Sequence, residues 1–201
     1  MSAVAPRPYR QVARAAATED LRRRVVMAFR DALLARWMDE ITLDDIAAAA
    51  GTTRQTVIRY FGGKEGLLTA VAETIKLEVE TARTLGPGFS PRQIAHGLVQ
   101  DYEVSGDVIV RLLAQEERHP LLTPFLNLGR AWHRQWVTET FAASLIGMRH
   151  QPRERRITEL VAITDVYTWK LLRRDFRHSA TEVETMIAEM LNKFIQGEKQ
   201  Q

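Results

Sequence analysis

The chain has 201 residues, of which 45% are hydrophobic and 26% are charged, and its formal net charge is +3. This composition is typical of a soluble globular protein with one or two domains. The absence of cysteine excludes disulfides and thiolate metal sites. No apolar run is long enough to cross a bilayer, and the N-terminus lacks the apolar region of a secretory signal. We therefore expect a cytoplasmic protein with no membrane partner.

Basic residues are concentrated near the N-terminus. The triplet Arg22–Arg24 follows three arginines that have no acidic residue among them, namely Arg7, Arg10 and Arg14. Such a run is most simply a solvated tail, although beside a DNA-binding element it would add attraction to phosphates. We predict that residues 1–17 form a basic, flexible arm and that the first helix covers residues 19–37, with Thr18 as its N-cap.

Two short, capped helices are predicted next, in the stretch ITLDDIAAAAGTTRQTVIRYF. Thr42 is placed to cap a helix over residues 43–50, with Asp45 three residues later as its partner in a capping box. Gly51 can adopt the left-handed conformation that ends this helix. Thr53 then caps a third, equally short helix.

The whole chain predicts an all-α fold of about nine helices. The fourth helix starts at Lys64 and ends near the Gly- and Pro-rich stretch LGPGFSP. Five further apolar stripes follow with helical spacing, at 94–102, 108–113, 125–146, 157–172 and 183–194. We predict that the domains cover residues 18–63 for the first helices, 64–84 for a connecting helix and 85–201 for a second helical domain.

Two short helices joined by a glycine turn are typical of a helix-turn-helix. Ala47 would let the second helix cross closely, Gly51 permits the turn, and Val57 would hold the pair together. The second helix of such a pair enters the major groove of DNA, where Arg and Gln side chains read base edges. The alternative for this polar short helix is a surface connector between two larger helices.

The segment ITLDDIAAAAGTTRQTVIRYFGGKEGLLTAVAE resembles the DNA-binding segment of the TetR family of bacterial transcriptional regulators. The positions that match the family pattern are Thr42, Ile46, Ala47, Ala50, Gly51, Thr53, Thr56, Tyr60, Phe61, Lys64, Glu65 and Leu67. The sequence departs from it at three places. Trp37-Met38 stand where family members often have Gly-aromatic, Gly62 stands where a Pro is frequent, and Ile58 stands where the family usually has an aromatic residue that contacts phosphate. Ile58 would instead touch a thymine methyl group.

The resemblance also implies which residues bind. Those expected to contact DNA are Thr42, Thr53, Arg54, Gln55, Thr56, Ile58, Arg59, Tyr60 and Lys64. The last two helices would form a homodimer interface that contains Leu160, Val161, Thr164, Val183, Ile187, Met190, Leu191 and Phe194. The middle helices would hold a small-molecule effector in a pocket lined by Tyr102, Trp132, His133, Trp136 and Tyr167, with Trp169 as a further possible lining residue. For each pocket residue taken singly, ordinary core packing is the simpler explanation.

The function that the resemblance implies is a repressor that a small-molecule effector releases from a palindromic operator in double-stranded DNA. The alternative is an effector-independent DNA-binding module, or an activator, of the same fold. The sequence contains no nucleophile elbow, phosphate loop or carboxylate–histidine motif, and its histidines lack metal-ligand spacing. We therefore expect no enzymatic activity, no cofactor and no metal.

Overall fold

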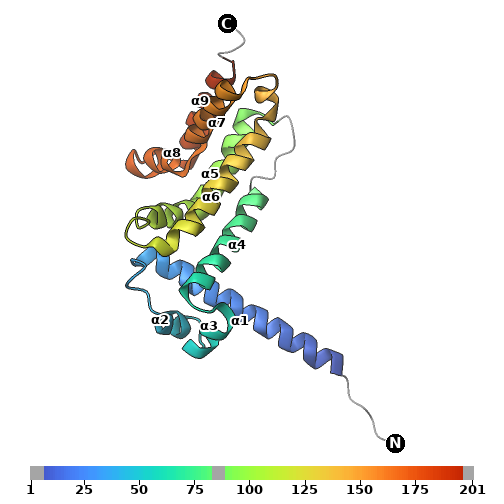
Figure 1. Ribbon diagram of the computed structural model, residues 1–201, viewed down its shortest axis with the longest axis vertical. Coiled ribbons are helices and arrows are strands. Elements are labelled where there is room, and N and C mark those ends of the chain that lie inside the picture. Colours follow the sequence, from blue (N-terminus) through green and yellow to red (C-terminus); the bar gives the residue numbers. More distant parts are fainter. Residues whose placement is uncertain (1–6, 83–88, 197–201) are drawn as a thin grey trace, which may run out of the picture. The chain divides into compact units, whose positions relative to one another are not determined.

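The computed structural model describes residues 7–82 and 89–196, which form helices α1 to α9 and no strand (Figure 1). This confirms the predicted all-α class. The chain divides into two compact units, Met1–Val71 and Ala72–Gln201, and the boundary falls inside α4 (Lys64–Ala82). Within the described ranges, no helix combines the length and the apolar character that crossing a membrane requires.

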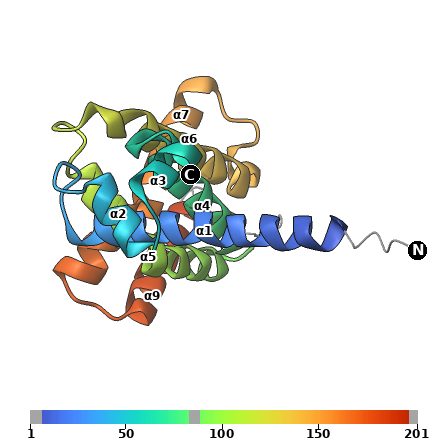
Figure 2. The ribbon, with the colours of Figure 1, turned by 90° about the horizontal axis from the view of Figure 1, so that it is seen from below.

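The first helix begins earlier than the sequence predicts. α1 spans Arg7–Ala35, so residues 7–17, which we expected to form a flexible arm, are helical, while residues 1–6 lie outside the described part. The added turns are rich in Ala and Arg, which have high helix propensity, and their one proline, Pro8, lies in the first turn, where a helix tolerates it. Figures 1 and 2 show this part of α1 extending away from α2 (Leu43–Ala49) and α3 (Arg54–Phe61).

The core of the first unit is built from one apolar face of each helix. Phe29 and Leu33 of α1, Ile46 of α2 and Val57 of α3 are each at most 1% exposed. Burying a side chain of this size contributes roughly 1.5–3 kcal/mol. Val57 therefore holds α3 in place, as the sequence predicts, while the rest of this short helix is left for other contacts.

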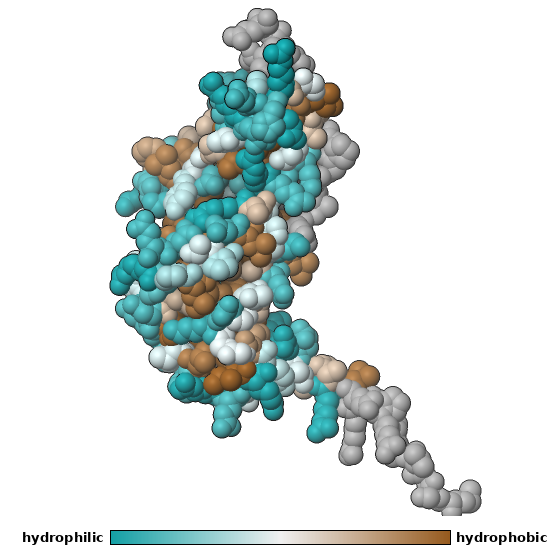
Figure 3. Space-filling model, viewed as in Figure 1, coloured by the Kyte–Doolittle hydropathy of each residue, from teal (hydrophilic) through white to brown (hydrophobic). Residues whose placement is uncertain are grey.

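The second unit continues α4 and adds α5 (Pro91–Leu113), α6 (Thr123–Thr140), α7 (His150–Thr164), α8 (Val166–Lys170) and α9 (Ala180–Gln196). Short 3₁₀ turns cover Pro120–Leu122 and Ala142–Leu145, and a π-helical turn, η3, covers Leu171–Asp175. Helix α5 packs against both α8 and α9. On the face drawn in Figure 3, hydrophilic side chains predominate and hydrophobic ones form separate patches.

One helix replaces two predicted ones in α5. The stripes at 94–102 and 108–113 belong to a single helix, although Ser105 and Gly106 between them resemble a break. The buried Ser105 hydroxyl donates to the backbone carbonyl of Asp101 at 3.1 Å. A Cβ atom on Gly106 would lie 2.5 Å from the Trp169 ring. Glycine therefore lets a large, fully buried side chain pack directly on the α5 backbone.

The predicted helix over 157–172 is interrupted in the structure. α7 ends at Thr164, and α8 begins at Val166. Between them Asp165 has an extended backbone, and its carboxylate accepts a hydrogen bond from the Tyr167 backbone N–H at 2.8 Å. Asp165 is thus the N-cap of α8. This cap, and not a change in the apolar period, interrupts the helix.

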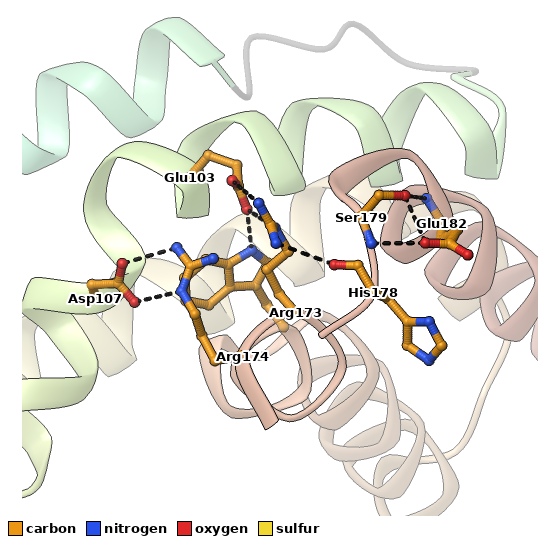
Figure 4. Close-up of polar contacts among 8 residues, drawn as sticks. Glu103, Asp107, Arg173, Arg174, His178, Ser179 and Glu182 are labelled. Carbon is orange, nitrogen blue, oxygen red and sulfur yellow. Dashed lines mark hydrogen bonds and ion pairs between the residues drawn. The ribbon is translucent and has the colours of Figure 1, made fainter. Parts of the chain in front are cut away.

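Two carboxylates on α5 hold the π-helical turn against that helix (Figure 4). Glu103 accepts hydrogen bonds from the Trp169 indole N–H at 3.1 Å and from Arg173 Nε at 2.9 Å. Asp107 accepts two hydrogen bonds from the Arg174 guanidinium, at 2.9 and 2.8 Å. That guanidinium also lies 4.6 Å from the centre of the Trp169 ring. The pairing raises the pKa of Arg174 above its usual value.

Replacing Glu103 with alanine should destabilise the second unit more than replacing Asp107. The Glu103→Ala variant leaves the indole N–H of the fully buried Trp169 without its acceptor, which costs about 1–3 kcal/mol. Asp107 is 54% exposed in its pair with Arg174, so Asp107→Ala should cost about 0–1 kcal/mol. Urea unfolding measures both free energies of unfolding. Equal losses would contradict the role assigned to Glu103.

Candidate nucleic-acid interface and cavity

Helix α2 begins with the predicted capping box. Thr42 Oγ1 accepts a hydrogen bond from the Asp45 backbone N–H, and the Asp45 carboxylate accepts one from the Thr42 backbone N–H, both at 3.1 Å. Arg36 Nη1 donates to the same carboxylate at 2.9 Å. The hydrogen bonds from Thr42, with the Arg36 guanidinium beside them, hold the pKa of Asp45 below its usual value.

The turn between α2 and α3 depends on Gly51, whose φ of 65° lies in the left-handed region. The Thr52 N–H returns to the Ala47 carbonyl at 2.9 Å, and Arg24 Nη1 donates to the Ala50 carbonyl at 2.9 Å. Thr53 then caps α3, since its hydroxyl accepts a hydrogen bond from the Thr56 N–H at 3.3 Å. The N-caps predicted at Thr42 and Thr53 are confirmed, whereas Thr18, predicted to cap the first helix, lies inside α1.

Most residues predicted to contact DNA lie on the exposed surface of this pair of helices. Only Val57 and Phe61 of α3 are buried, whereas Thr56, Tyr60 and Lys64 are half-buried. The remaining predicted residues are exposed: Thr42, Thr53, Arg54, Gln55, Ile58 and Arg59. Local folding thus presents a polar surface on a helix that two apolar side chains hold in place.

Tyr60 is flanked by two arginines. Arg59 Nη2 donates to the Tyr60 hydroxyl at 3.3 Å, and the Arg59 guanidinium lies 4.8 Å from the centre of the phenol ring. Arg22 Nη1 lies 3.5 Å from the Tyr60 carbonyl, and the Arg22 guanidinium is 5.0 Å from the centre of the Phe61 ring. The phenol therefore sits in a positive environment at the end of α3.

Several basic side chains near α3 have structural partners that sequence reasoning missed. Arg23 and Arg24 both pair with Asp20, at 2.7 and 3.2 Å, and the hydrogen bond from Arg23 lowers the pKa of Asp20. Lys64 Nζ donates to the Met38 backbone carbonyl at 2.9 Å. A backbone acceptor distant in the chain gives no signal in a sequence pattern. The predicted contact of Lys64 with phosphate stays a prediction.

Arg54 has an acidic partner that the sequence did not indicate either. Its Nη1 lies 3.2 Å from Asp44 Oδ2, and the two side chains are 59% and 65% exposed. Asp44 belongs to the first turn of α2, and Arg54 is the first residue of α3. The crossing of the two helices brings them together.

The second unit contains a cavity of about 190 Å³. Five of the predicted pocket residues, Tyr102, Trp132, His133, Trp136 and Tyr167, line it, whereas Trp169 is fully buried in the core of the second unit. The other lining side chains are mostly apolar and include Ala72, Ile75, Val79, Ile109, Leu113, Phe125, Leu126, Val161 and Val166. That these residues bind an effector stays a prediction. Among the residues that the structure describes, no cluster of His, Asp and Glu could hold a metal ion.

Two polar side chains of the cavity wall, Tyr102 and His133, contact Thr164. The Tyr102 hydroxyl donates to the Thr164 carbonyl at 3.0 Å, and His133 Nε2 lies 3.1 Å from Thr164 Oγ1. The Thr164 hydroxyl also lies 2.8 Å from the Leu160 carbonyl. A hydroxyl has one proton, so both bonds form together when Thr164 donates to that carbonyl and the His133 tautomer carries its hydrogen on Nε2.

Arg130 also lines the cavity, and it forms an ion pair with Glu116. Arg130 Nη1 lies 2.9 Å from Glu116 Oε1. This hydrogen bond lowers the pKa of Glu116 and raises that of Arg130. The cavity wall therefore carries a guanidinium whose charge is already balanced within the second unit.

The residues predicted to form the dimer interface differ in how much of their surface is accessible. Five of them are fully buried in the core of the second unit: Leu160, Thr164, Val183, Ile187 and Leu191. Val161 lines the cavity, while Met190 and Phe194 are half-buried. Phe194 also packs against Arg156, whose guanidinium is 3.8 Å from the ring centre. The homodimer stays a prediction, and Met190 and Phe194 are its predicted α9 residues that retain accessible surface.

The stability that Asp45 gives to the first unit should depend on pH in acid. Its pKa is lower in the folded chain than in the unfolded one, so its contribution is present above the unfolded value, near 4, and is lost as the pH falls through the folded value. Urea unfolding of wild type and Asp45→Asn at pH 6 and pH 3 measures this. The gap between them should shrink at pH 3, and a constant gap would contradict the assignment.

Comparisons with known proteins agree with this geometry. Residues 34–71 match the family model described as bacterial regulatory proteins, tetR family. The HTH-type transcriptional regulator AlkX from Mycobacterium tuberculosis is 45% identical over 65 residues, which are 32% of this chain and only 29% of that relative. The crystal structure of a protein assigned to the TetR family of transcriptional regulators, from Rhodococcus sp., has a TM-score of 0.63 at 18% identity and covers 87% of this chain and 98% of its own.

Proposed function

We propose that this chain is a member of the TetR family of bacterial regulatory proteins and a sequence-specific DNA-binding transcriptional regulator. In this proposal a homodimer represses transcription by binding a palindromic operator. A small molecule that binds the second unit releases the operator. The proposal assigns no catalytic residue.

The observation that carries the proposal is the exposed surface of α3. This helix has eight residues, a capped start at Thr53 and a left-handed glycine, Gly62, at its end. It commits two side chains to the core and leaves Arg54 and Gln55 in solvent. Arginine and glutamine read the edges of guanine and adenine, and a short exposed helix after a glycine turn is the element that helix-turn-helix proteins place in the major groove.

Selection of fragments from random DNA by the full chain tests this function. We expect enrichment of a palindrome, because a two-fold dimer presents α3 to two half-sites. Affinity should fall steeply between low and physiological salt, since contacts of Arg and Lys with phosphates release counterions. Failure to enrich any sequence at low salt would contradict the proposal. Enrichment of a single, non-palindromic site would contradict the dimer but not the DNA-binding function.

We also propose that the cavity binds a small, mainly apolar effector. Its volume of about 190 Å³ is somewhat larger than the roughly 150 Å³ of an engineered cavity that holds benzene. Trp132, Trp136 and Tyr167 would supply aromatic surface for such a molecule. The cavity favours an effector-responsive regulator over the effector-independent alternative.

Helix α4 supports a route from this cavity to DNA. It is one helix that starts at Lys64, and two residues separate it from α3, the reading helix. Its residues Ala72, Ile75 and Val79 line the cavity. An effector that prefers one position of α4 would shift the population of conformations toward it. Release of DNA requires that this position fit the operator less well.

Obstructing the cavity should abolish the response to ligands. Gly129 borders it, and a Cβ atom added there meets no atom within 4 Å, so both Gly129→Ala and Gly129→Phe should fold. Indole and toluene should raise the Tm of wild type and of Gly129→Ala, because a ligand that binds only the folded state stabilises it. They should not raise the Tm of Gly129→Phe. An unchanged response of Gly129→Phe would contradict binding at the part of the cavity that Gly129 borders.

A further inference from the structure

We propose that Asp44 is a positioning residue for Arg54 and thereby determines which base pair the first turn of α3 selects. This inference rests on the proposed DNA-binding function. It concerns one carboxylate of α2 that would not need to touch a base itself.

The geometry leaves Arg54 able to serve Asp44 and a base together. Only Nη1 of the guanidinium contacts Asp44 Oδ2, at 3.2 Å. A guanidinium has five N–H donors in a rigid plane, and bidentate recognition of guanine uses two of them. The contact with Asp44 therefore restricts the direction of the plane and leaves enough donors for the base edge.

The fold itself gains little from this pair. An ion pair with both side chains more than half exposed is screened by water and contributes little to stability. The start of α2 is also already satisfied, because Thr42 and Asp45 form the capping box. Arg36 pairs with Asp45. Asp44 also lies in the first turn of α2, where a carboxylate interacts favourably with the helix dipole, so folding gives a modest reason for an acid at position 44 that does not require Arg54.

For DNA binding in general, Asp44 is unfavourable. A carboxylate beside the reading helix repels phosphates and weakens binding to every sequence. Its compensating effect is on Arg54, because contact with DNA removes water and strengthens the attraction between the two charges. A guanidinium held in one direction loses less side-chain freedom on binding and fits one base edge better than the others. Asp44 would therefore trade general affinity for selectivity.

The test compares Asp44→Asn with Glu65→Gln in the full chain. Glu65 is an exposed acid in the first turn of α4, so Glu65→Gln removes the same charge near the reading helix without changing the environment of Arg54. Dissociation constants are measured for the selected operator and for every single-base replacement in it. The same set is measured for Arg54→Ala and for the Asp44→Asn/Arg54→Ala double variant.

We expect both charge-removing variants to bind non-specific DNA more tightly than wild type. Arg54→Ala should lose discrimination at one base pair of each half-site by roughly 5- to 150-fold. Asp44→Asn should lose roughly three- to tenfold at the same base pair, and Glu65→Gln should lose none. The double variant should discriminate there no worse than Arg54→Ala alone, because Asp44 acts through Arg54.

Two results would overturn the inference while leaving the proposed function intact. In the first, Asp44→Asn and Glu65→Gln have the same specificity profile, so Asp44 acts only as a charge. In the second, the losses from Asp44→Asn and Arg54→Ala multiply, so Asp44 acts independently of Arg54. Failure of the wild-type chain to select any sequence would instead overturn the proposed function. Thermal melting of Asp44→Asn at the wild-type temperature confirms that a loss of selectivity does not come from unfolding.

Discussion

The short helices of the first unit depend on hydrogen bonds made at their ends. α2 has seven residues and α3 has eight, whereas an isolated helix shorter than about 12–15 residues is marginal in water. Threonine hydroxyls cap the N-termini of α2 and α3. At the C-terminal ends of the same helices, side chains of α1 reach backbone carbonyls, Arg24 that of Ala50 and Arg22 that of Tyr60. Because these contacts and a few apolar side chains hold α3, most of its surface is free of structural duties.

This arrangement changes what the basic composition means. Several basic side chains near α3 already have partners within the first unit. These side chains are Arg22, Arg23 and Arg24 of α1 and Lys64 of α4, and they contact backbone carbonyls, aromatic rings or Asp20. The basic residues of α3, Arg54 and Arg59, are exposed, and Arg54 forms an ion pair with Asp44. With a net charge of only +3, this chain is better suited to selective contacts than to general attraction by phosphates.

The features that could be predicted from sequence are those with local signals. Thr42, Asp45, Gly51 and Thr53 act within a few residues of themselves, and the structure has these caps and this turn where the pattern indicated them. The role of Gly106 has no local signal, because the Trp169 ring that packs on it lies far away in the chain. The apolar stripe of α9 had the right period, but a period does not tell whether the partner is the same chain or a second copy. The sequence also contains no signal of the Asp44–Arg54 pair, because the two residues come together only when α2 and α3 cross.

The same constraint on helix ends links the cavity to the interruption between α7 and α8. Thr164 is the last residue of α7, so its carbonyl has no partner within the helix, and the Tyr102 hydroxyl supplies one. His133, which also lines the cavity, holds the Thr164 hydroxyl. A molecule that competes for either of these side chains removes a partner from the end of α7. The turn that follows α8 is tied to α5 by Glu103 and Asp107. In the proposed effector response, a ligand in this mostly apolar cavity would act on the end of α7 through its contacts with Tyr102 and His133.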